Sequence, residues 1–294
     1  MHVLLTGSTG YIGSAVLRAL RSAGHTVTAL VRSDEAAGRV RGAGAEPVVG
    51  DMRDADLVRR LASGVDGAIH AAATGDEQSA DADRALTEAV IAGLGERGAP
   101  FVRTGGIWAH GSGEAITEQT PRNAPGIVAW REAIDVAALA APGIRSVLIE
   151  PGIVYGHGQG IPNVVTRAEV TADAEPALVL LGDGSQHWAT VHVDDLATLY
   201  LLALENAPHG STYLGVNGHN PTVREMGEAA SRVRGLGGRV VPEPASATVE
   251  RLGAFGEALL LDQQATGTAA RTDLGWTPTR PTLLDEIEAG HYTD

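Results

Sequence analysis

The sequence of 294 residues contains neither cysteine nor lysine. Without cysteine, it cannot form disulfides, thiolate nucleophiles, iron–sulfur clusters or cysteine-ligated zinc sites. Without lysine, all 22 basic residues are arginine, a side chain that stays protonated and cannot serve as a general base. The absence of lysine, with abundant alanine and glycine, also suggests a GC-rich bacterial genome, which says nothing of function.

Concentrated positive charge and long apolar runs are lacking too. The formal net charge is −14 and the arginines are scattered, so neither nucleic acid nor an anionic membrane is an expected partner. No run approaches the roughly 18–20 apolar residues that a membrane span needs. The N-terminal segment MHVLLTGSTG is apolar for too few residues to be a signal peptide. We therefore expect a soluble, cytoplasmic protein.

Short apolar runs alternate with helical patterns through the first half of the chain. The expected strands cover residues 3–5, 27–31, 46–49, 67–70, 100–103 and 145–149, and the expected helices cover residues 11–23, 54–61, 80–97 and 127–141. This alternation predicts an α/β fold with a doubly wound parallel sheet of the Rossmann type. The irregular remainder indicates a dinucleotide-binding domain of residues 1–155, to which 189–215 return, and a smaller substrate lobe of residues 156–188 and 216–294.

A glycine-rich turn, TGSTGYIG at residues 6–13, lies between the first expected strand and the first expected helix. Gly7 allows a tight turn, Gly10 lets a pyrophosphate approach the backbone, and Gly13 lets the helix pack closely on the strand. The helix N-terminus then offers free N–H groups and partial positive charge to phosphates. A helix start that merely needs glycine is the alternative, but the position between strand and helix favours a dinucleotide site.

The end of the second expected strand distinguishes NAD from NADP. A carboxylate there would bind the ribose 2′-hydroxyl of NAD, whereas an arginine would pair with the 2′-phosphate of NADP. The chain reads LVRSDEA, so Arg32 and Ser33 occupy this place, and Asp34 comes two residues late, where it can cap the next helix. We therefore expect NADP(H) as the cofactor.

Further motifs follow along the chain: GDMRD at 50–54, HAAAT at 70–74, EPGIVYG at 150–156, VHVDDLA at 191–197, LGVNGHNPTVREM at 214–226 and LGWTP at 274–278. With the glycine turn, they resemble the extended or atypical short-chain dehydrogenase/reductases, a superfamily of NAD(P)-dependent epimerases, dehydratases and reductases. The resemblance covers nearly the whole chain and is specific for the fold, but not for a reaction. The residues that it and the glycine turn place at the cofactor are Gly7, Thr9, Gly10, Tyr11, Ile12, Gly13, Arg32, Ser33, Asp51, Met52, Ala71, Ala72, Ala73, Arg131, Pro151 and Ile153.

The usual catalytic set of this superfamily is a Ser or Thr after the fifth strand and a Tyr-x-x-x-Lys on the next helix. The lysine lowers the pKa of the tyrosine, which then transfers a proton while hydride moves to or from nicotinamide. The serine often precedes a glycine by five residues, here Gly106 before Gly111, and an acidic residue, here Asp135, often follows the lysine by four. By this placement Gly106, Ile127 and Arg131 replace Ser, Tyr and Lys, so the usual proton relay is absent.

Arg131 can still hold the nicotinamide ribose, and the alternative is a surface ion pair with Asp135. Trp130 either forms the floor of the substrate pocket or, as we favour, packs in the core. The candidate catalytic residues are Arg131 and the possible proton donors Thr104, His110, Tyr155, His157 and, more distantly, Thr74.

Each proton donor also has an ordinary explanation. Thr104 could hydrogen-bond a substrate oxygen, and His110 could titrate near neutrality, although a histidine in such a loop is more often solvated. Tyr155 in a VYG turn is commonly a packing residue. The residue types of metal ligands occur at His187, His192, Asp194 and Asp195, but VHVDDLA is the packing motif of the superfamily, with Asp194 or Asp195 capping the helix, so no metal is expected.

The function that we expect is NADP(H)-dependent reduction of a small, apolar or aromatic carbonyl, imine or enone that is already activated, without the Tyr–Lys relay. The alternatives are a non-redox enzyme on the same scaffold (cyclisation, hydration, epoxide opening or elimination) and an NADP(H)-sensing binding protein. Sugar nucleotides are disfavoured because only Arg167 could clamp their phosphates. Oligomeric state stays open, and a homodimer through helices 80–97 and 127–141 would be ordinary for the superfamily.

Overall fold

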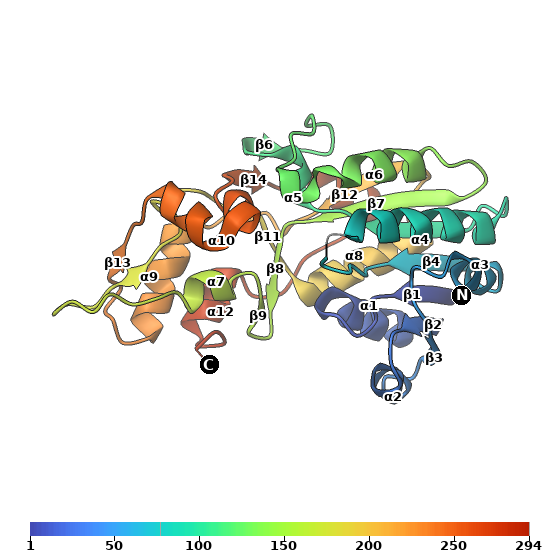
Figure 1. The fold of residues 1–294 in the computed structure, drawn as a ribbon, viewed down its shortest axis with the longest axis horizontal. Coiled ribbons are helices and arrows are strands. Elements are labelled where there is room, and N and C mark those ends of the chain that lie inside the picture. Colours follow the sequence, from blue (N-terminus) through green and yellow to red (C-terminus); the bar gives the residue numbers. More distant parts are fainter. Residues whose placement is uncertain (77, 294) are drawn as a thin grey trace.

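The central sheet of the computed structural model, which describes residues 1–76 and 78–293, confirms the predicted α/β fold (Figure 1). Seven strands, all parallel, lie in the order β12-β7-β5-β4-β1-β2-β3. They are β1 (His2–Thr6), β2 (Thr26–Val31), β3 (Glu46–Val49), β4 (Gly67–His70), β5 (Pro100–Thr104), β7 (Arg145–Pro151) and β12 (Ser211–Gly215). Because the strands are parallel, the loops that follow β1 to β5 all begin at one edge of the sheet.

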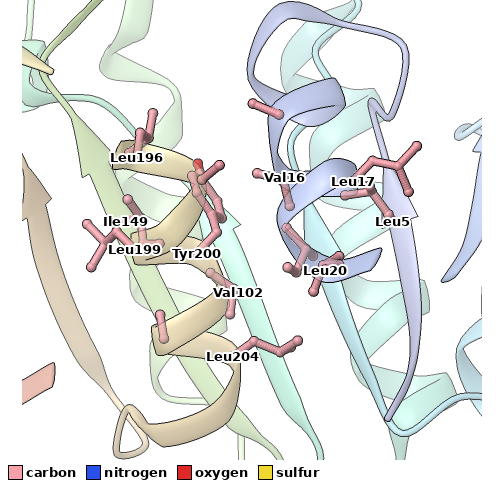
Figure 2. Packing of buried hydrophobic residues seen from close by; sticks show 14 of the residues in the cluster. Leu5, Val16, Leu17, Leu20, Val102, Ile149, Leu196, Leu199, Tyr200 and Leu204 are labelled. Carbon is pink, nitrogen blue, oxygen red and sulfur yellow. The ribbon is translucent and has the colours of Figure 1, made fainter. Parts of the chain in front are cut away.

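Helices cover both faces of this sheet. One face carries α1 (Tyr11–Ser22), α2 (Asp34–Gly42), α8 (Val193–Asn206) and α11 (Thr268–Leu274), and the other carries α3 (Ala55–Ser63), α4 (Ser79–Leu94) and α6 (Arg131–Leu139). Along β1, Val3 and Leu5 belong to the first core and Leu4 to the second, as the two-residue period of a strand requires. Figure 2 shows α1 and α8 facing each other across the first core, with Leu20 and Leu204 between them.

A smaller lobe follows β7, at the far side of the molecule from β3 (Figure 1). Its strands are β8 (Ile153–Gly156), β9 (Gln159–Gly160), β10 (Leu178–Val179), β11 (Thr190–His192) and β13 (Val240–Val241), and its helices are α7 (Asn163–Thr166), α9 (Val223–Val233), α10 (Ala245–Leu259) and α12 (Leu283–Glu288). A third layer of short elements lies between the two parts: a 3₁₀ turn at Ile107–His110, β6 (Gly113–Ile116), α5 (Gly126–Ala129) and β14 (Gln263–Ala265), which pairs with β6.

Two predictions about the later part of the chain need correction. Residues 268–276 were assigned to the smaller lobe, yet Ala270, Leu274 and Trp276 belong to the core of the large sheet. Neither Asp194 nor Asp195 caps α8: the Nδ1 of His192 accepts the N–H of Asp194, and the Asp195 carboxylate accepts two backbone N–H groups at 279 and 280. Trp276 donates its indole N–H to the Asp195 carbonyl, which ties the closing LGWTP motif to this helix.

The helix expected over 127–141 is divided into α5 and α6 at Trp130. The Trp130 indole N–H donates to the carbonyl of Ile127 at 3.2 Å and so competes with the backbone donor for that carbonyl. Trp130 is therefore half-buried at the break and does not pack in the core as we had favoured.

Candidate cofactor cleft and active site

The glycine turn has the conformation that its spacing predicts. Gly7 has φ +79, and a Cβ there would lie 2.4 Å from the carbonyl oxygen of Ala71, while a Cβ on Gly13 would lie 2.0 Å from the carbonyl oxygen of Gly7. Both positions therefore require glycine. Gly10 precedes α1 and supplies no side-chain cap, so the first N–H groups of the helix remain free to bind phosphate.

A cleft of about 380 Å³ opens over this turn, between the ends of β1, β2, β3 and β4. The residues that line it are Thr6, Gly7, Thr9, Gly10, Leu30, Val31, Arg32, Arg39, Gly50, Asp51, Met52, Arg53, Ala71, Ala72, Ala73, Thr74 and Asp76. Nine residues of the expected cofactor set are among them. The small side chains after β4 leave room for a flat group to cross the sheet edge, as a dinucleotide does.

Three arginines stand at the mouth of this cleft and differ in what they contact. Arg39 of α2 pairs with Glu35 at 2.8 Å, and Arg53 pairs with Asp76 at 3.0 Å. Arg32 is exposed and forms no hydrogen bond or ion pair with the residues that the structure describes. An uncommitted guanidinium thus lies directly after β2, where the ribose 2′ position of a dinucleotide would come.

Several other expected cofactor residues do not line the cleft. The Oγ of Ser33 caps α2 by accepting the N–H of Ala36, and Ile12 packs against the core. The Tyr11 hydroxyl donates to the carbonyl of Gly156, which joins the glycine turn to β8 of the smaller lobe. Pro151 and Ile153 are buried where β7 passes into β8. Contact of these residues with a cofactor stays a prediction.

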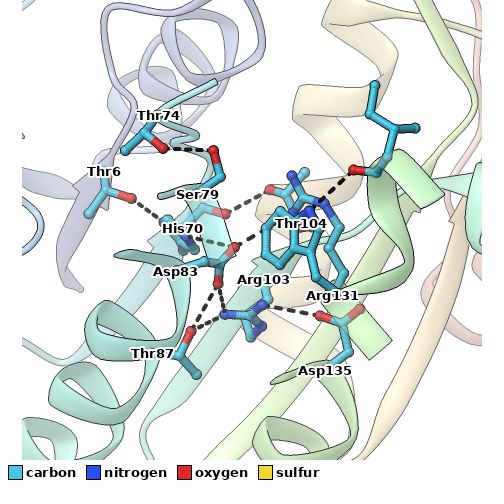
Figure 3. A network of polar contacts seen from close by, with 12 residues as sticks. Thr6, His70, Thr74, Ser79, Asp83, Thr87, Arg103, Thr104, Arg131 and Asp135 are labelled. Carbon is cyan, nitrogen blue, oxygen red and sulfur yellow. Dashed lines mark hydrogen bonds and ion pairs between the residues drawn. The ribbon is translucent and has the colours of Figure 1, made fainter. Parts of the chain in front are cut away.

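The expected relay positions lie on elements that follow β5: Gly106 precedes the 3₁₀ turn, Ile127 lies on α5, which contacts that turn, and Arg131 begins α6. A Cβ added at Gly106 would have no neighbour within 4 Å, and Ile127 is 37% exposed, so this corner is open and apolar. Arg131 lies beside them, and one of its terminal nitrogens is 3.4 Å from the Thr104 carbonyl oxygen and 3.6 Å from the Asp83 carboxylate (Figure 3). Its guanidinium also stacks 4.4 Å from the centre of the Trp130 ring. The alternative ion pair with Asp135 is not formed.

A buried ionic chain runs beneath this corner, and sequence reasoning missed it. It links His70, Asp83, Arg103, Asp135, Arg122, Glu150 and His110 through contacts of 2.8 to 3.7 Å. Arg103 is 1% exposed in the middle of the sheet. A charged residue inside an otherwise apolar strand, PFVRT, was the available signal, because a buried arginine needs buried carboxylates.

The structure places the five possible proton donors in different surroundings, and Thr74 lines the cofactor cleft with its hydroxyl donating to the Asp76 carboxylate at 2.8 Å. Thr104 donates to the His70 carbonyl at 2.7 Å and accepts from the Tyr200 hydroxyl at 2.6 Å, so its only proton is already engaged. Tyr155 is fully buried and donates to the carbonyl of Pro281 at 2.7 Å; burial raises its pKa. His157 is exposed beside α8, with its Nε2 3.0 Å from the Asp194 carboxylate.

His110 is buried, contrary to the solvated state that we considered more frequent. Its two ring nitrogens face the Thr120 carbonyl and the Glu150 carboxylate, each at 2.9 Å. Burial alone would lower its pKa, but the hydrogen bond and charge of Glu150 outweigh burial and raise it. An imidazolium that donates on both sides fits this environment and has no proton free for a substrate.

Possible metal-ligating side chains gather at the start of α8, and none of them lines the cleft. His157, His192 and Asp194 bring ligand atoms within 4.8 Å of one another, whereas His187 pairs with Asp262. The Asp194 carboxylate already contacts Arg18 at 3.3 Å and Arg280 at 3.4 Å. These two cations occupy the carboxylate that a metal ion would need.

The smaller lobe offers aromatic surface near the relay corner but little free positive charge. Trp108 packs edge-on against Phe255 of α10, with ring centres 6.0 Å apart. Three arginines of this lobe bond backbone carbonyls and three pair with carboxylates: Arg224, Arg234 and Arg239, and Arg232, Arg251 and Arg280, respectively. Arg167 is exposed and makes no such contact within the described part of the chain.

Within residues 1–76 and 78–293, no helix combines the length and the apolar character that crossing a membrane requires.

The chain is similar in sequence to known proteins. The profile described as "NAD dependent epimerase/dehydratase family" matches residues 3–214. An uncharacterised protein of Schizosaccharomyces pombe is 30% identical over 305 residues, which cover 99% of this chain and all of that protein.

Two further similarities concern proteins with stated activities. The 4-hydroxy-2-methyl-3-oxo-4-farnesyl-3,4-dihydroquinoline-1-oxide ketoreductase of Stigmatella aurantiaca is 28% identical over 271 residues, covering 86% of this chain and 80% of that enzyme. The structure of a Thermotoga maritima UDP-glucose 4-epimerase with UDP-glucose superposes with a TM-score of 0.75 at 19% identity, covering 100% and 98% of the two chains. That structural match shows the shared fold.

Proposed function

The chain belongs to the NAD-dependent epimerase/dehydratase family, as its extended short-chain dehydrogenase/reductase motifs indicated, and we propose that it is an NADP(H)-dependent reductase within it. The observations that carry this proposal are a cleft over the glycine turn and, at the carboxyl end of β5, Arg131 at the position expected for the relay lysine, with Ile127 at the position expected for the tyrosine. The family is largely one of nicotinamide-dependent enzymes, so the open question is which reaction the altered corner supports.

NADP(H) is favoured over NAD(H) by the charge at the mouth of the cleft. Within the described residues Arg32 has no ionic partner and can pair with a 2′-phosphate, and Arg39, which also lines the cleft, forms an exposed pair with Glu35. No carboxylate ends β2 to accept the 2′-hydroxyl of NAD, since Ser33 caps α2 and Asp34 lies inside that helix.

The reactive end suits a substrate that needs no proton donor in the protein. Arg131 would hydrogen-bond the nicotinamide ribose and add positive charge beside the reacting atoms. When bound, NADPH would supply the hydride for an electrophilic carbon of the substrate, and water would supply the proton that the reduced carbonyl oxygen or imine nitrogen takes up. General acid catalysis contributes typically about 10²–10⁴-fold, so an iminium, a quinone-like enone or another activated carbonyl can react without it.

The substrate class that we propose is small, apolar and cyclic or aromatic. Ile127, Trp108 and Phe255 make the entrance to the corner apolar, and a relative that reduces a farnesylated quinoline oxide supports this choice. Sugar nucleotides, which related folds bind, need a phosphate clamp. Among the described arginines of the smaller lobe, all except Arg167 already bond backbone carbonyls or pair with carboxylates. We therefore disfavour sugar nucleotides as substrates.

A homodimer through α4 and α6 stays a prediction. The two helices pack together and share an apolar groove of about 380 Å³ lined by Ile91 and Ile134, and Val136 of α6 is 57% exposed. Sedimentation at several concentrations distinguishes a dimer from a monomer.

The proposed function is tested by binding followed by turnover. NADPH and NADH are titrated separately into the protein, and imines, quinones, cyclic enones and ketones are then added while absorbance is followed at 340 nm. We expect tighter binding of NADPH and its oxidation by at least one activated acceptor. Failure to bind NADPH would overturn the proposal; binding without oxidation by any acceptor would favour an NADP(H)-sensing protein.

A further inference from the structure

The two carboxylate oxygens of Asp83 face different arginines. Asp83 lies on α4, with 5% of its side chain exposed. Its Oδ1 accepts from Arg103 at 2.9 Å, and its Oδ2 lies 3.6 Å from Arg131 and 3.7 Å from His70 (Figure 3). One oxygen is therefore held inside the protein, and the other is directed toward the cation at the reactive corner.

Arg103 explains why Arg131 is available at that corner. Asp135 follows Arg131 by four residues on α6, a spacing at which an arginine and a carboxylate ordinarily pair. Here Arg103 donates to Oδ1 of Asp135 at 3.1 Å, and Arg122 donates to Oδ2 of Asp135 at 3.4 Å. Because both carboxylate oxygens of Asp135 are engaged, Arg131 instead contacts the Asp83 carboxylate and the Thr104 carbonyl at the end of β5.

The remaining contacts hold Arg131 without using up its donors. The Thr104 carbonyl at 3.4 Å and the Trp130 ring at 4.4 Å border the guanidinium, which has five N–H groups and, among the described residues, only these contacts and the one to Asp83. The side chain is 21% exposed, and Arg131 directly follows α5, on which Ile127 is 37% exposed. A guanidinium fixed on three sides with donors to spare is suited to hydrogen-bond a ligand.

We propose that Asp83 is a positioning residue that presents Arg131 to the nicotinamide ribose of the cofactor, with Arg103 freeing Arg131 by engaging Asp135. This inference rests on the proposed NADP(H) function and names two residues through which that function acts. Fixing a long side chain before binding removes part of the cost of ordering it. Loss of Asp83 is therefore expected to weaken only those ligands that reach Arg131.

The test compares NADPH with adenosine 2′,5′-bisphosphate, which carries the adenosine half of the cofactor and ends before the nicotinamide ribose. Dissociation constants of both are measured for the wild-type protein and for Asp83→Asn, Arg131→Gln and the double variant. Asp81→Asn is the matched control, since Asp81 is an exposed carboxylate on the same helix. We expect Asp83→Asn to weaken NADPH about three- to tenfold and the bisphosphate less than about twofold. In the Arg131→Gln background, the further effect of Asp83→Asn on NADPH should vanish.

Because Asp83 is buried among charges, Asp83→Asn can fail to fold, and thermal unfolding is recorded for each variant. Asp83→Glu keeps the buried charge but displaces the carboxylate, and it should show the same selective loss of NADPH affinity. Equal loss of both ligands in a folded variant, or additive effects of the two substitutions, would overturn the positioning role. If the wild-type protein binds neither ligand, the proposed function itself has failed. If the wild-type protein binds both ligands and the variants bind them with the same dissociation constants, only the positioning role of Asp83 has failed.

Discussion

Replacing Arg32 by alanine removes the uncommitted guanidinium at the mouth of the cofactor cleft. Arg32 is exposed, and Arg32→Ala breaks no contact with any residue that the structure describes, so it should leave the thermal unfolding temperature unchanged. Any change in cofactor affinity then reports on the interaction with the 2′-phosphate itself.

The size of the effect follows from the surroundings of Arg32. A phosphate carries a charge of about −1.5 to −2 at neutral pH, and a hydrogen bond to a charged group contributes about 1.5–3 kcal/mol. Exposure to water reduces this, since exposed ion pairs contribute about 0.2–1 kcal/mol. We therefore expect a loss of about 1–2 kcal/mol, or roughly 5- to 30-fold in the dissociation constant of NADPH. Arg39 can replace part of the lost charge by leaving Glu35.

The assay is titration of NADPH and of NADH into the wild-type protein and Arg32→Ala at low and moderate salt. NADH affinity should change less than about twofold, and the difference between the variants should shrink with salt, because exposed charges are screened. Arg41→Ala is the matched control, because Arg41 is an exposed arginine on α2, the helix that follows Arg32, and does not line the cleft. Equal weakening of NADPH and NADH, or a wild-type preference for NADH, would refute the reasoning.

Three further outcomes are expected. The triple variant Gly106→Ser, Ile127→Tyr and Arg131→Lys restores the Ser, Tyr and Lys of the relay, and the first two positions have room for the larger side chains. It should reduce an unactivated ketone at least about tenfold faster than wild type. Stopped-flow absorbance at 340 nm measures this rate. Tyr155→Phe should leave hydride transfer within about twofold of wild type, since the hydroxyl is buried against a backbone carbonyl; a larger loss of rate at unchanged stability would restore Tyr155 as a proton donor. The pKa of His110 is raised in the folded protein, so its ion pair with Glu150 stabilises the fold fully below about pH 6.5, the pKa of histidine in the unfolded chain. This stabilisation is lost as the pH rises through the folded pKa of His110. The unfolding temperature of wild type minus that of His110→Gln should therefore be largest near about pH 6 and fall toward about pH 9; a pH-independent difference would contradict it.

The sequence predicted the parts of the fold that depend on local patterns. Alternating apolar runs indicated the sheet, and the tight positions Gly7 and Gly13 follow from the motif that places them.

The contacts between distant residues could not be predicted from such patterns. Asp83, Arg103 and Asp135 come from two helices and a strand, and only the packing of α4 and α6 against the sheet shows that Arg103 takes the carboxylate that Arg131 was expected to use. Likewise, nothing in the loop sequence around His110 indicated Glu150, which lies 40 residues later and makes the histidine a buried ionic partner.

The central claim is that this protein transfers hydride from NADPH without a Tyr–Lys relay. The most direct measurement is a single turnover with NADPH deuterated at the transferring position of nicotinamide C4 and an activated acceptor, followed by mass spectrometry of the product. The account predicts one deuterium bound to product carbon at a rate that Tyr155→Phe does not change. A transformed substrate without deuterium, while NADPH remains reduced, would contradict it and point to non-redox chemistry.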